Sequence, residues 1–287
     1  MPSSAAELVE LLDLETIDLN LFRGKQPDTR MQRVFGGQVA AQALVAAFRT
    51  APEEVQVHSM HSYFLRPGDT AVPIVYDVDR VRDGRSFATR RVLARQHGRP
   101  IYALTASFQV EEDGFAHQDA MPDVPSPEES LDVVAAMKSA DPVRREEWLR
   151  EWSALELRHA GDSRPGGQLP NDRHPAVVRY WIKVGDRLPD DVLVHRAALT
   201  YISDLTLLGA TLVPHGLHPG SSKVQAASLD HTVWFHRPFR ADEWLLYDQS
   251  SPIAVGARGL ALGRLFTQDG RLVASVAQEG LIRPRSS

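Results

Sequence analysis

The chain has 287 residues, of which 43% are hydrophobic and 24% are charged, and its formal net charge is −5. This length predicts two domains or one duplicated domain, and the composition is that of an ordinary globular protein, which excludes disordered and fibrous classes. The lack of basic excess argues against nucleic acid as a partner, and the absence of cysteine excludes disulfides, thiolate zinc sites and a cysteine nucleophile.

The N-terminal residues carry acidic side chains and no basic flank before the first apolar run, which is not the pattern of a signal peptide. No stretch approaches the roughly 18 uninterrupted apolar residues of a membrane span. We therefore expect no membrane span and a cytoplasmic location.

The first 114 residues predict two helices followed by antiparallel strands. Ser4 and Glu7 form an S-x-x-E capping box, which predicts a short helix that begins there. Apolar residues at helical spacing with few charges predict a mostly buried helix over residues 38–48. From residue 57 to residue 109 the apolar period changes to two, which predicts strands joined by hairpins, one of them at Gln96-His97-Gly98.

Prolines and charged residues then break the pattern over residues 115–148, which we interpret as a connecting segment between an N-terminal unit, 1–114, and a C-terminal unit, 149–287. In the second unit, residues 154–159 and 177–184 predict strands. Asp204 precedes three leucines at helical spacing, which predicts that a helix begins near Asp204. Strands resume from residue 226.

The two units match each other when the chain is laid over itself. Tyr63-Phe64-Leu65-Arg66-Pro67 matches Trp234-Phe235-His236-Arg237-Pro238 at an offset of 171 residues. Arg85 then matches Arg258, and Gly98-Arg99 matches Gly270-Arg271, in the same order and at nearly the same offset. Ahead of these matches, the helix over 38–48 pairs with residues 204–213 at an offset of 166 residues. A buried helix against an antiparallel sheet, occurring twice, predicts an α+β double hotdog fold, in which two hotdog units are fused.

Several long segments also resemble one family. These segments are Val34-Phe35-Gly36-Gly37-Gln38, residues 58–68, residues 83–87, residues 229–238 and Ala277-Gln278-Glu279-Gly280. They are similar to acyl-CoA thioesterase II, the TesB type, over nearly the whole chain. The resemblance implies a double hotdog enzyme that hydrolyses fatty acyl-CoA without a cofactor. It places the catalytic Asp, Thr or Ser, and Gln of the family on Asp204, Ser228 and Gln278, and the commoner residue at the middle position is Thr. We also expect a homo-oligomer, a dimer or tetramer of double hotdogs.

The residue types suit the chemistry. Thioester hydrolysis needs a nucleophilic water and a donor for the developing oxyanion, but little help for a thiolate whose thiol has a pKa near 8.5. At a helix N-terminus, Asp204 is either an N-cap or a general base beside free N–H groups, and the two roles can coexist. Gln278 ends an apolar stripe on a predicted strand, where a long amide needs partners. Ser228 alternates with polar residues on a predicted strand, so its assignment rests on the resemblance.

The first unit has Gln38, Val57 and Ser107 at the positions that we align with Asp204, Ser228 and Gln278. No carboxylate stands there, so we expect one active site per chain, with the first unit supplying walls and substrate contacts. Candidate substrate contacts are Gln38, His58, Arg85 and Arg258, and structural roles are the alternative for each of them. His215 and His218 have no carboxylates at helical spacing, which argues against a zinc site.

Two other functions stay open. A hotdog enoyl-CoA hydratase or dehydratase needs a group that moves a proton at carbon, usually with a His, whereas Asp204 with Ser228 and Gln278 favours activation of water. A non-catalytic acyl-CoA-binding module would keep the pocket without the three polar residues.

Overall fold

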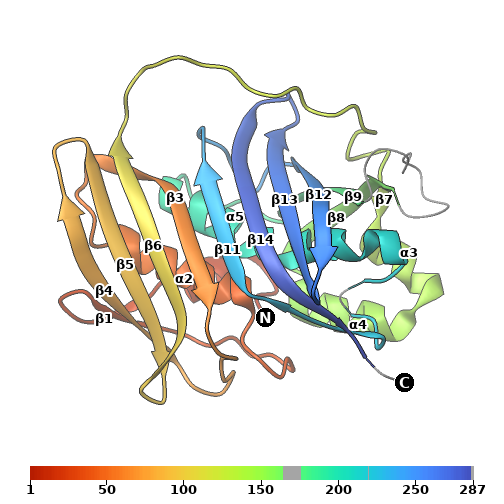
Figure 1. Ribbon diagram of the computed structural model, residues 1–287, viewed down its shortest axis with the longest axis horizontal. Coiled ribbons are helices and arrows are strands. Elements are labelled where there is room, and N and C mark those ends of the chain that lie inside the picture. Colours follow the sequence, from red (N-terminus) through yellow and green to blue (C-terminus); the bar gives the residue numbers. More distant parts are fainter. Residues whose placement is uncertain (164–175, 219, 286–287) are drawn as a thin grey trace.

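The strands form one antiparallel sheet with helices on one face of it (Figure 1). The computed structural model describes residues 1–163, 176–218 and 220–285. The helices are α1 (Ala5–Leu12), α2 (Gly36–Phe48), α3 (Val133–Ala140), α4 (Pro142–Trp152) and α5 (Val192–Thr206), which continues into a 3-10 helix, η1 (Leu207–His215). The strands of the N-terminal part are β1 (Glu15–Asp18), β2 (Leu21–Gly24), β3 (Val55–Phe64), β4 (Ile74–Asp83), β5 (Phe87–Gln96) and β6 (Arg99–Val110). The remaining strands are β7 (Leu131–Asp132), β8 (Leu155–Asp162), β9 (Val177–Val184), β10 (Val224–Ser228), β11 (Asp230–Phe235), β12 (Leu245–Val255), β13 (Arg258–Thr267) and β14 (Leu272–Pro284).

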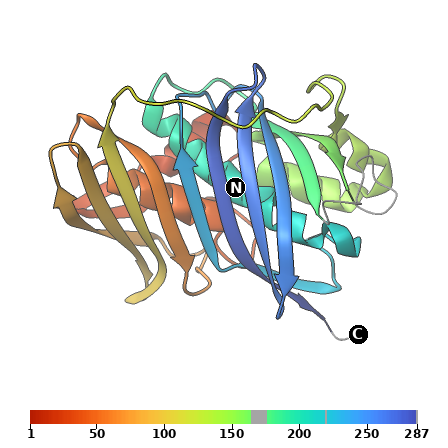
Figure 2. The ribbon, with the colours of Figure 1, turned by 45° about the horizontal axis from the view of Figure 1, so that its top comes forward.

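Pairing between β3 and β11 joins the two units into a continuous sheet. Within the described residues the order is β1-β2-β4-β5-β6-β3-β11-β14-β13-β12-β9-β8-β7, and β10 pairs with β14. The β3–β11 ladder sets His61 opposite Thr232. The helices α2 and α5 pack against each other on the same face of the sheet (Figures 1 and 2). This arrangement confirms the predicted α+β double hotdog.

Local signals place the first elements as expected. The Ser4 hydroxyl accepts a hydrogen bond from the Glu7 N–H at 3.3 Å, and the Glu7 carboxylate accepts one from the Ser3 N–H at 2.8 Å, which caps α1. The β5–β6 hairpin turns at His97 and Gly98, whose φ angles are 49° and 72°. Two successive positive φ angles are the requirement of a tight hairpin turn, and glycine meets it without strain.

The prediction that a helix begins near Asp204 is wrong. The helix α5 begins twelve residues earlier, where the Asp191 carboxylate accepts a hydrogen bond from the Leu193 N–H at 2.8 Å, and Asp204 lies in its last turn. The described packing puts η1, which follows, on β12, β13 and β14. Since α2 packs in the same way on β4, β5 and β6, η1 is the part of the second helical stretch that corresponds to α2.

The stretch 192–215 is also long and apolar enough to cross a membrane, but 72% of its apolar window is buried inside the protein. Its packing against the sheet and α2 identifies it as a core helix.

Between β6 and β7 the chain runs without helix or strand along one end of the sheet, past the β13–β14 turn (Figure 2). The Gln118 amide donates to the Gly270 carbonyl at 2.8 Å, and Arg264 pairs with Asp119 at 3.0 Å, which ties this segment to the second unit. It then leads into α3 and α4. Trp152, the last residue of α4, packs edge-on against Phe35, just before α2, with ring centroids 4.8 Å apart.

Candidate functional site

The fold brings Asp204, Ser228 and Gln278 into direct contact. The Ser228 hydroxyl donates to Asp204 Oδ1 at 3.1 Å, and the Gln278 amide donates to the same oxygen at 2.5 Å. The three side chains come from α5, the end of β10 and the middle of β14. Residues far apart in the sequence therefore meet around one carboxylate oxygen, and the second oxygen is left for another partner.

Ser228 is positioned by a break between the strands β10 and β11. The predicted continuous strand through residues 228–232 is interrupted after Ser228, which ends β10 opposite Gly280. The Leu229 N–H then donates to the Glu279 carbonyl at 2.9 Å, and the Asp230 carboxylate accepts from the Glu279 N–H at 2.7 Å. These bonds turn the chain between β10 and β11 and leave the Ser228 hydroxyl pointing at Asp204.

Gln278 lies on the inner face of β14, where Ala274, Val276 and Gly280 are also buried. This confirms the predicted apolar stripe with a long amide near its end. The Gln278 side chain is fully buried. Its amide oxygen has no hydrogen-bond partner among the described residues. The amide group is oriented by Asp204, because only its nitrogen can donate to a carboxylate.

The N-terminus of α2 supplies a further contact to Asp204. Phe35 precedes this helix and provides no side-chain cap, but the Gly37 N–H donates to the Asp204 carboxylate. The helix N-terminus beside Asp204 is therefore that of α2. Asp204 does not cap the helix that contains it, as the sequence predicted, but accepts a hydrogen bond from the first turn of a helix in the other unit.

Two glycines allow this approach. A Cβ atom at Gly36 would lie 2.5 Å from Asp204 Oδ2, and one at Gly37 would lie 2.3 Å from the Tyr201 carbonyl oxygen. A side chain at Gly36 would displace the Asp204 carboxylate, and one at Gly37 would force the backbones of α2 and α5 apart. Gly36 and Gly37 are contributors to the site that reasoning from residue types missed, and the signal for them is a glycine pair at the start of a helix that has no Ser, Thr, Asp or Asn at its N-cap.

Burial raises the pKa of Asp204 to about 6, while the hydrogen bonds from Gln278, Ser228 and Gly37 act in the opposite direction. Burial has the largest effect on this pKa, because the loss of water destabilises the charged form by more than the three hydrogen bonds stabilise it. Among the described residues, Asp204 has no ion-pair partner. A carboxylate with this pKa is mostly ionised at neutral pH and is a better base than an ordinary aspartate.

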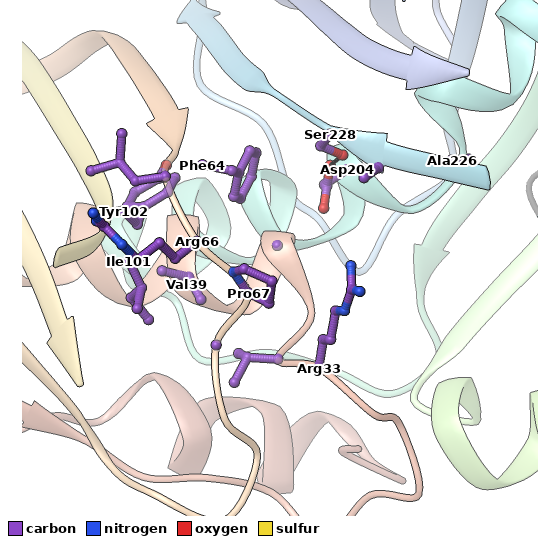
Figure 3. A pocket seen from close by; sticks show the side chains of 15 residues that line it. Arg33, Val39, Phe64, Arg66, Pro67, Ile101, Tyr102, Asp204, Ala226 and Ser228 are labelled. Carbon is purple, nitrogen blue, oxygen red and sulfur yellow. Dashed lines mark hydrogen bonds between the residues drawn. The ribbon is translucent and has the colours of Figure 1, made fainter. Parts of the chain in front are cut away.

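Two cavities meet at Asp204 and Ser228. The first, of about 300 Å³, is lined by apolar side chains that include Val39, Phe64 and Ile101, and also by Arg66 and Tyr102 (Figure 3). The second cavity is larger, about 510 Å³. It is lined by Phe35, Trp152, Leu205 and Leu208. The wall that both cavities share consists of Arg33, Val34, Gly36, Asp204, Ala226, Ala227 and Ser228. A substrate that fills both cavities would pass Asp204 at its middle.

The four predicted substrate contacts lie elsewhere. Gln38 is buried and donates to the Gln26 side chain at 3.0 Å. His58 is bonded to the Ser107 hydroxyl at 2.8 Å. Arg85 is exposed, and Arg258 pairs with Glu279 at 3.0 Å. None of the four lines either cavity at Asp204.

The predicted equivalence of Gln278 with Ser107 is wrong by one residue. At the offset of 171 residues, His61 of the first unit corresponds to Thr232 of the second. His61 pairs with Thr105 and Thr232 pairs with Ala277, so Thr105 corresponds to Ala277. The next residues, Ala106 and Gln278, therefore correspond to each other. Ala106 is fully buried on the inner face of β6, and Ser107 is the next residue. The first unit still has no ionisable group at the positions that match Ser228 and Gln278. Among the described residues, no three His, Asp or Glu side chains gather to hold a metal ion.

Comparisons with known proteins show the family to which the chain is similar. A family model described as acyl-CoA thioesterase matches residues 163–281, and one described as acyl-CoA thioesterase N-terminal domain matches residues 26–109. The chain is 41% identical over 281 residues to acyl-CoA thioesterase 2 of Haemophilus influenzae, with 96% of each chain covered. It is 42% identical to acyl-coenzyme A thioesterase 8 of Homo sapiens, covering 95% of this chain and 88% of the relative.

Solved structures show the same likeness. The acyl-CoA thioesterase II TesB2 of Mycobacterium marinum superposes with a TM-score of 0.83 at 46% identity, covering 97% of this chain and 99% of the other. A tesB protein of Mycobacterium avium subs paratuberculosis superposes with a TM-score of 0.80 at 33% identity, covering 98% and 100%. A dehydratase of type I polyketide synthases has 14% identity and a TM-score of 0.51, which speaks only to the fold.

Proposed function

The chain belongs to the acyl-CoA thioesterase II family and is a thioester hydrolase, and we propose that it cleaves fatty acyl-CoA with a water activated by Asp204. The observation that carries this proposal is the Asp204 carboxylate, which is held through one oxygen by Ser228 and Gln278 at the junction of two cavities. Its other oxygen, Oδ2, has no hydrogen bond from a side chain among the described residues, and we propose that it accepts the proton from water.

In the proposed reaction, Asp204 takes a proton as the water oxygen bonds to the thioester carbon. The tetrahedral intermediate then collapses, the carbon–sulfur bond breaks, and the sulfur keeps the bonding electron pair. Asp204 returns its proton to solvent or to the thiolate. Ser228 and Gln278 hold the carboxylate in one orientation, which keeps the water close to the carbonyl carbon. The positive end of α2 lies beside the reacting atoms and favours the negative charge that develops there.

The alternative hydratase or dehydratase finds no support in the cavity walls. Neither of the two cavities at Asp204 is lined by a histidine among the described residues. The non-catalytic binding module is also disfavoured, because a pure binding pocket does not need an ionisable carboxylate of raised pKa in an apolar wall.

The test is thiol release from acyl-CoA substrates of increasing chain length, starting with palmitoyl-CoA. We expect release of one thiol per free fatty acid. Addition of water to an enoyl-CoA without thiol release would establish the hydratase, and tight binding of acyl-CoA without turnover would establish the binding module.

We further propose that residues 1–114 and 149–287 form the two hotdog units, that residues 115–148 connect them, and that the protein is a cytoplasmic homo-oligomer. Light scattering of the purified protein measures the oligomeric state. Limited proteolysis tests the boundaries, because we expect the first cuts within residues 115–148.

A further inference from the structure

A third cavity, of about 320 Å³, adjoins the site beside α4. It is lined by Arg30, Met31, Arg144, Glu147, Trp148, Arg150, Glu151 and Trp152. Met31 and Trp152 also line the larger cavity at Asp204. The walls therefore continue from the catalytic carboxylate, past Met31 and Trp152, to a cavity that carries three arginines.

The positive charge of this third cavity is only partly neutralised. Glu151 accepts hydrogen bonds from Thr29, from the Arg30 N–H, from Arg150 and from the N-terminal amine. Its negative charge is therefore already paired and does not neutralise the other two arginine side chains. Arg150 is its ion-pair partner at 3.1 Å. Among the described residues that line this cavity, Glu147 is the other carboxylate.

Two guanidinium groups in this wall lack a carboxylate partner among the described residues. The Arg30 side chain has no hydrogen bond there, and Arg144 has only the His218 ring nitrogen at 3.5 Å. Arg33, on the wall at Asp204, is exposed and has no hydrogen-bonded partner in the described part of the chain. Unpaired arginines around a cavity form an anion site, and their planar donors match phosphate oxygens.

An aromatic side chain lies in the same wall. Trp148 is half-buried, and its indole N–H has no hydrogen-bond partner among the described residues. A tryptophan face beside arginines suits a flat heteroaromatic ring attached to phosphates. The third cavity thus combines the two features that a phosphorylated nucleotide requires.

We infer that Arg30, Arg144 and Trp148 bind the phosphorylated adenosine end of CoA. This inference rests on the proposed function and defines the orientation of acyl-CoA in the three cavities. The nucleotide occupies the third cavity, the pantetheine arm passes Met31 and Trp152, and the thioester lies at Asp204. The acyl chain then extends into the smaller cavity, against Val39, Phe64 and Ile101.

The experiment compares two substrates, palmitoyl-CoA and palmitoyl-pantetheine, which share the thioester but differ in the nucleotide. For Arg30→Gln, Arg144→Gln and the double variant, we expect KM for palmitoyl-CoA to rise, by about tenfold or more in the double variant, with kcat nearly unchanged. The same variants should hydrolyse palmitoyl-pantetheine like the wild type. Adenosine 3′,5′-bisphosphate should inhibit the wild type and lose this effect in the double variant.

The matched controls are Arg85→Gln and Arg258→Gln, which remove arginines that lie outside the third cavity. Both should leave the kinetics of the two substrates unchanged. The inference is overturned if the double variant affects both substrates equally, or if the controls reproduce its effect. If the wild type hydrolyses neither substrate, the proposed function fails, and binding of the bisphosphate, followed through tryptophan fluorescence, still tests the nucleotide site.

Discussion

The Gly37 N–H of α2 donates a hydrogen bond to the carboxylate of Asp204, which belongs to α5 of the other unit. The proposed active site is thus built by both halves of the chain, although the groups that touch the carboxylate oxygen Oδ1 are both in the second half. The first unit contributes a helix N-terminus and cavity walls. This division explains how one half can lack a carboxylate and still be needed for the site.

The raised pKa of Asp204 predicts the pH dependence of turnover. The base must be ionised, so kcat/KM should fall about tenfold per pH unit below a midpoint near 6 and should level off above it. The effect of pH on stability has the opposite sign. Folding raises the pKa of Asp204 from its ordinary value of 3.8 to about 6, so the folded protein binds this proton more tightly than the unfolded chain does. The contribution of Asp204 to the free energy of unfolding should therefore increase as the pH falls from about 6 to about 3.8. A pH–rate profile checks the first statement, and a midpoint near 4 would contradict it.

Ser228 is expected to act through its hydroxyl. Ser228→Thr should keep most of the activity, whereas Ser228→Val should lower kcat by about tenfold or more, because Asp204 loses a donor. In the first unit the matching position is Val57, which pairs with Phe108 as Ser228 pairs with Gly280. We therefore expect the strand backbone at residue 228 to accept valine. Steady-state kinetics of both variants, with thermal melting as a control of folding, make the comparison. Equal rates for the Thr and Val variants would show that the hydroxyl is not needed.

The two glycines of α2 should respond differently to alanine. A methyl group at Gly36 meets Asp204 and the Phe64 ring, which are side chains that can shift, so Gly36→Ala should mainly lower kcat. A methyl group at Gly37 meets the Tyr201 backbone carbonyl, which cannot shift without moving α5, so Gly37→Ala should mainly lower the melting temperature. Kinetics and melting of the two variants test this, and the same change in both variants would count against the proposed geometry.

Gln278 and Gln38 are both buried glutamines, but only Gln278 contacts Asp204. Gln278→Ala should therefore slow the chemical step by about tenfold or more, while Gln38→Ala, which removes a bond to Gln26, should act on stability. Single-turnover hydrolysis at saturating acyl-CoA measures the chemical step directly. A tight-binding inhibitor should titrate one site per chain, and two sites per chain would contradict the asymmetry between the units.

Much of the fold follows from local patterns. The capping box of α1, the buried helix α2 and the β5–β6 turn depend on residues within a few positions of each other, and each is found where the pattern predicts it. The start of α5 was misplaced because Asp204 before leucines resembles an N-cap. The signal that decides it is Asp191, which caps the helix in the structure.

Prediction of the site needed information about residues that are far apart in the sequence. The resemblance implies Asp204, Ser228 and Gln278, and in the structure these three side chains contact one another; their catalytic role stays a prediction. The approach of Gly36 and Gly37 to Asp204 is a tertiary contact between units, and the arginines beside α4 are assembled from segments more than 100 residues apart. No periodicity or spacing reports such distances. The single-residue error at Ser107 has the same origin, since the two strands of a pair need not keep one offset.

The measurement that tests the central claim most directly is single-turnover hydrolysis of palmitoyl-CoA by Asp204→Asn beside the wild type. The substitution keeps the shape of the side chain and removes the base, so we expect the chemical step to slow by about 100-fold or more. The melting temperature above pH 6 should stay the same or rise, because a buried charge is removed. A folded Asn variant that hydrolyses palmitoyl-CoA at a rate near that of the wild type would contradict the assignment of Asp204 as the general base.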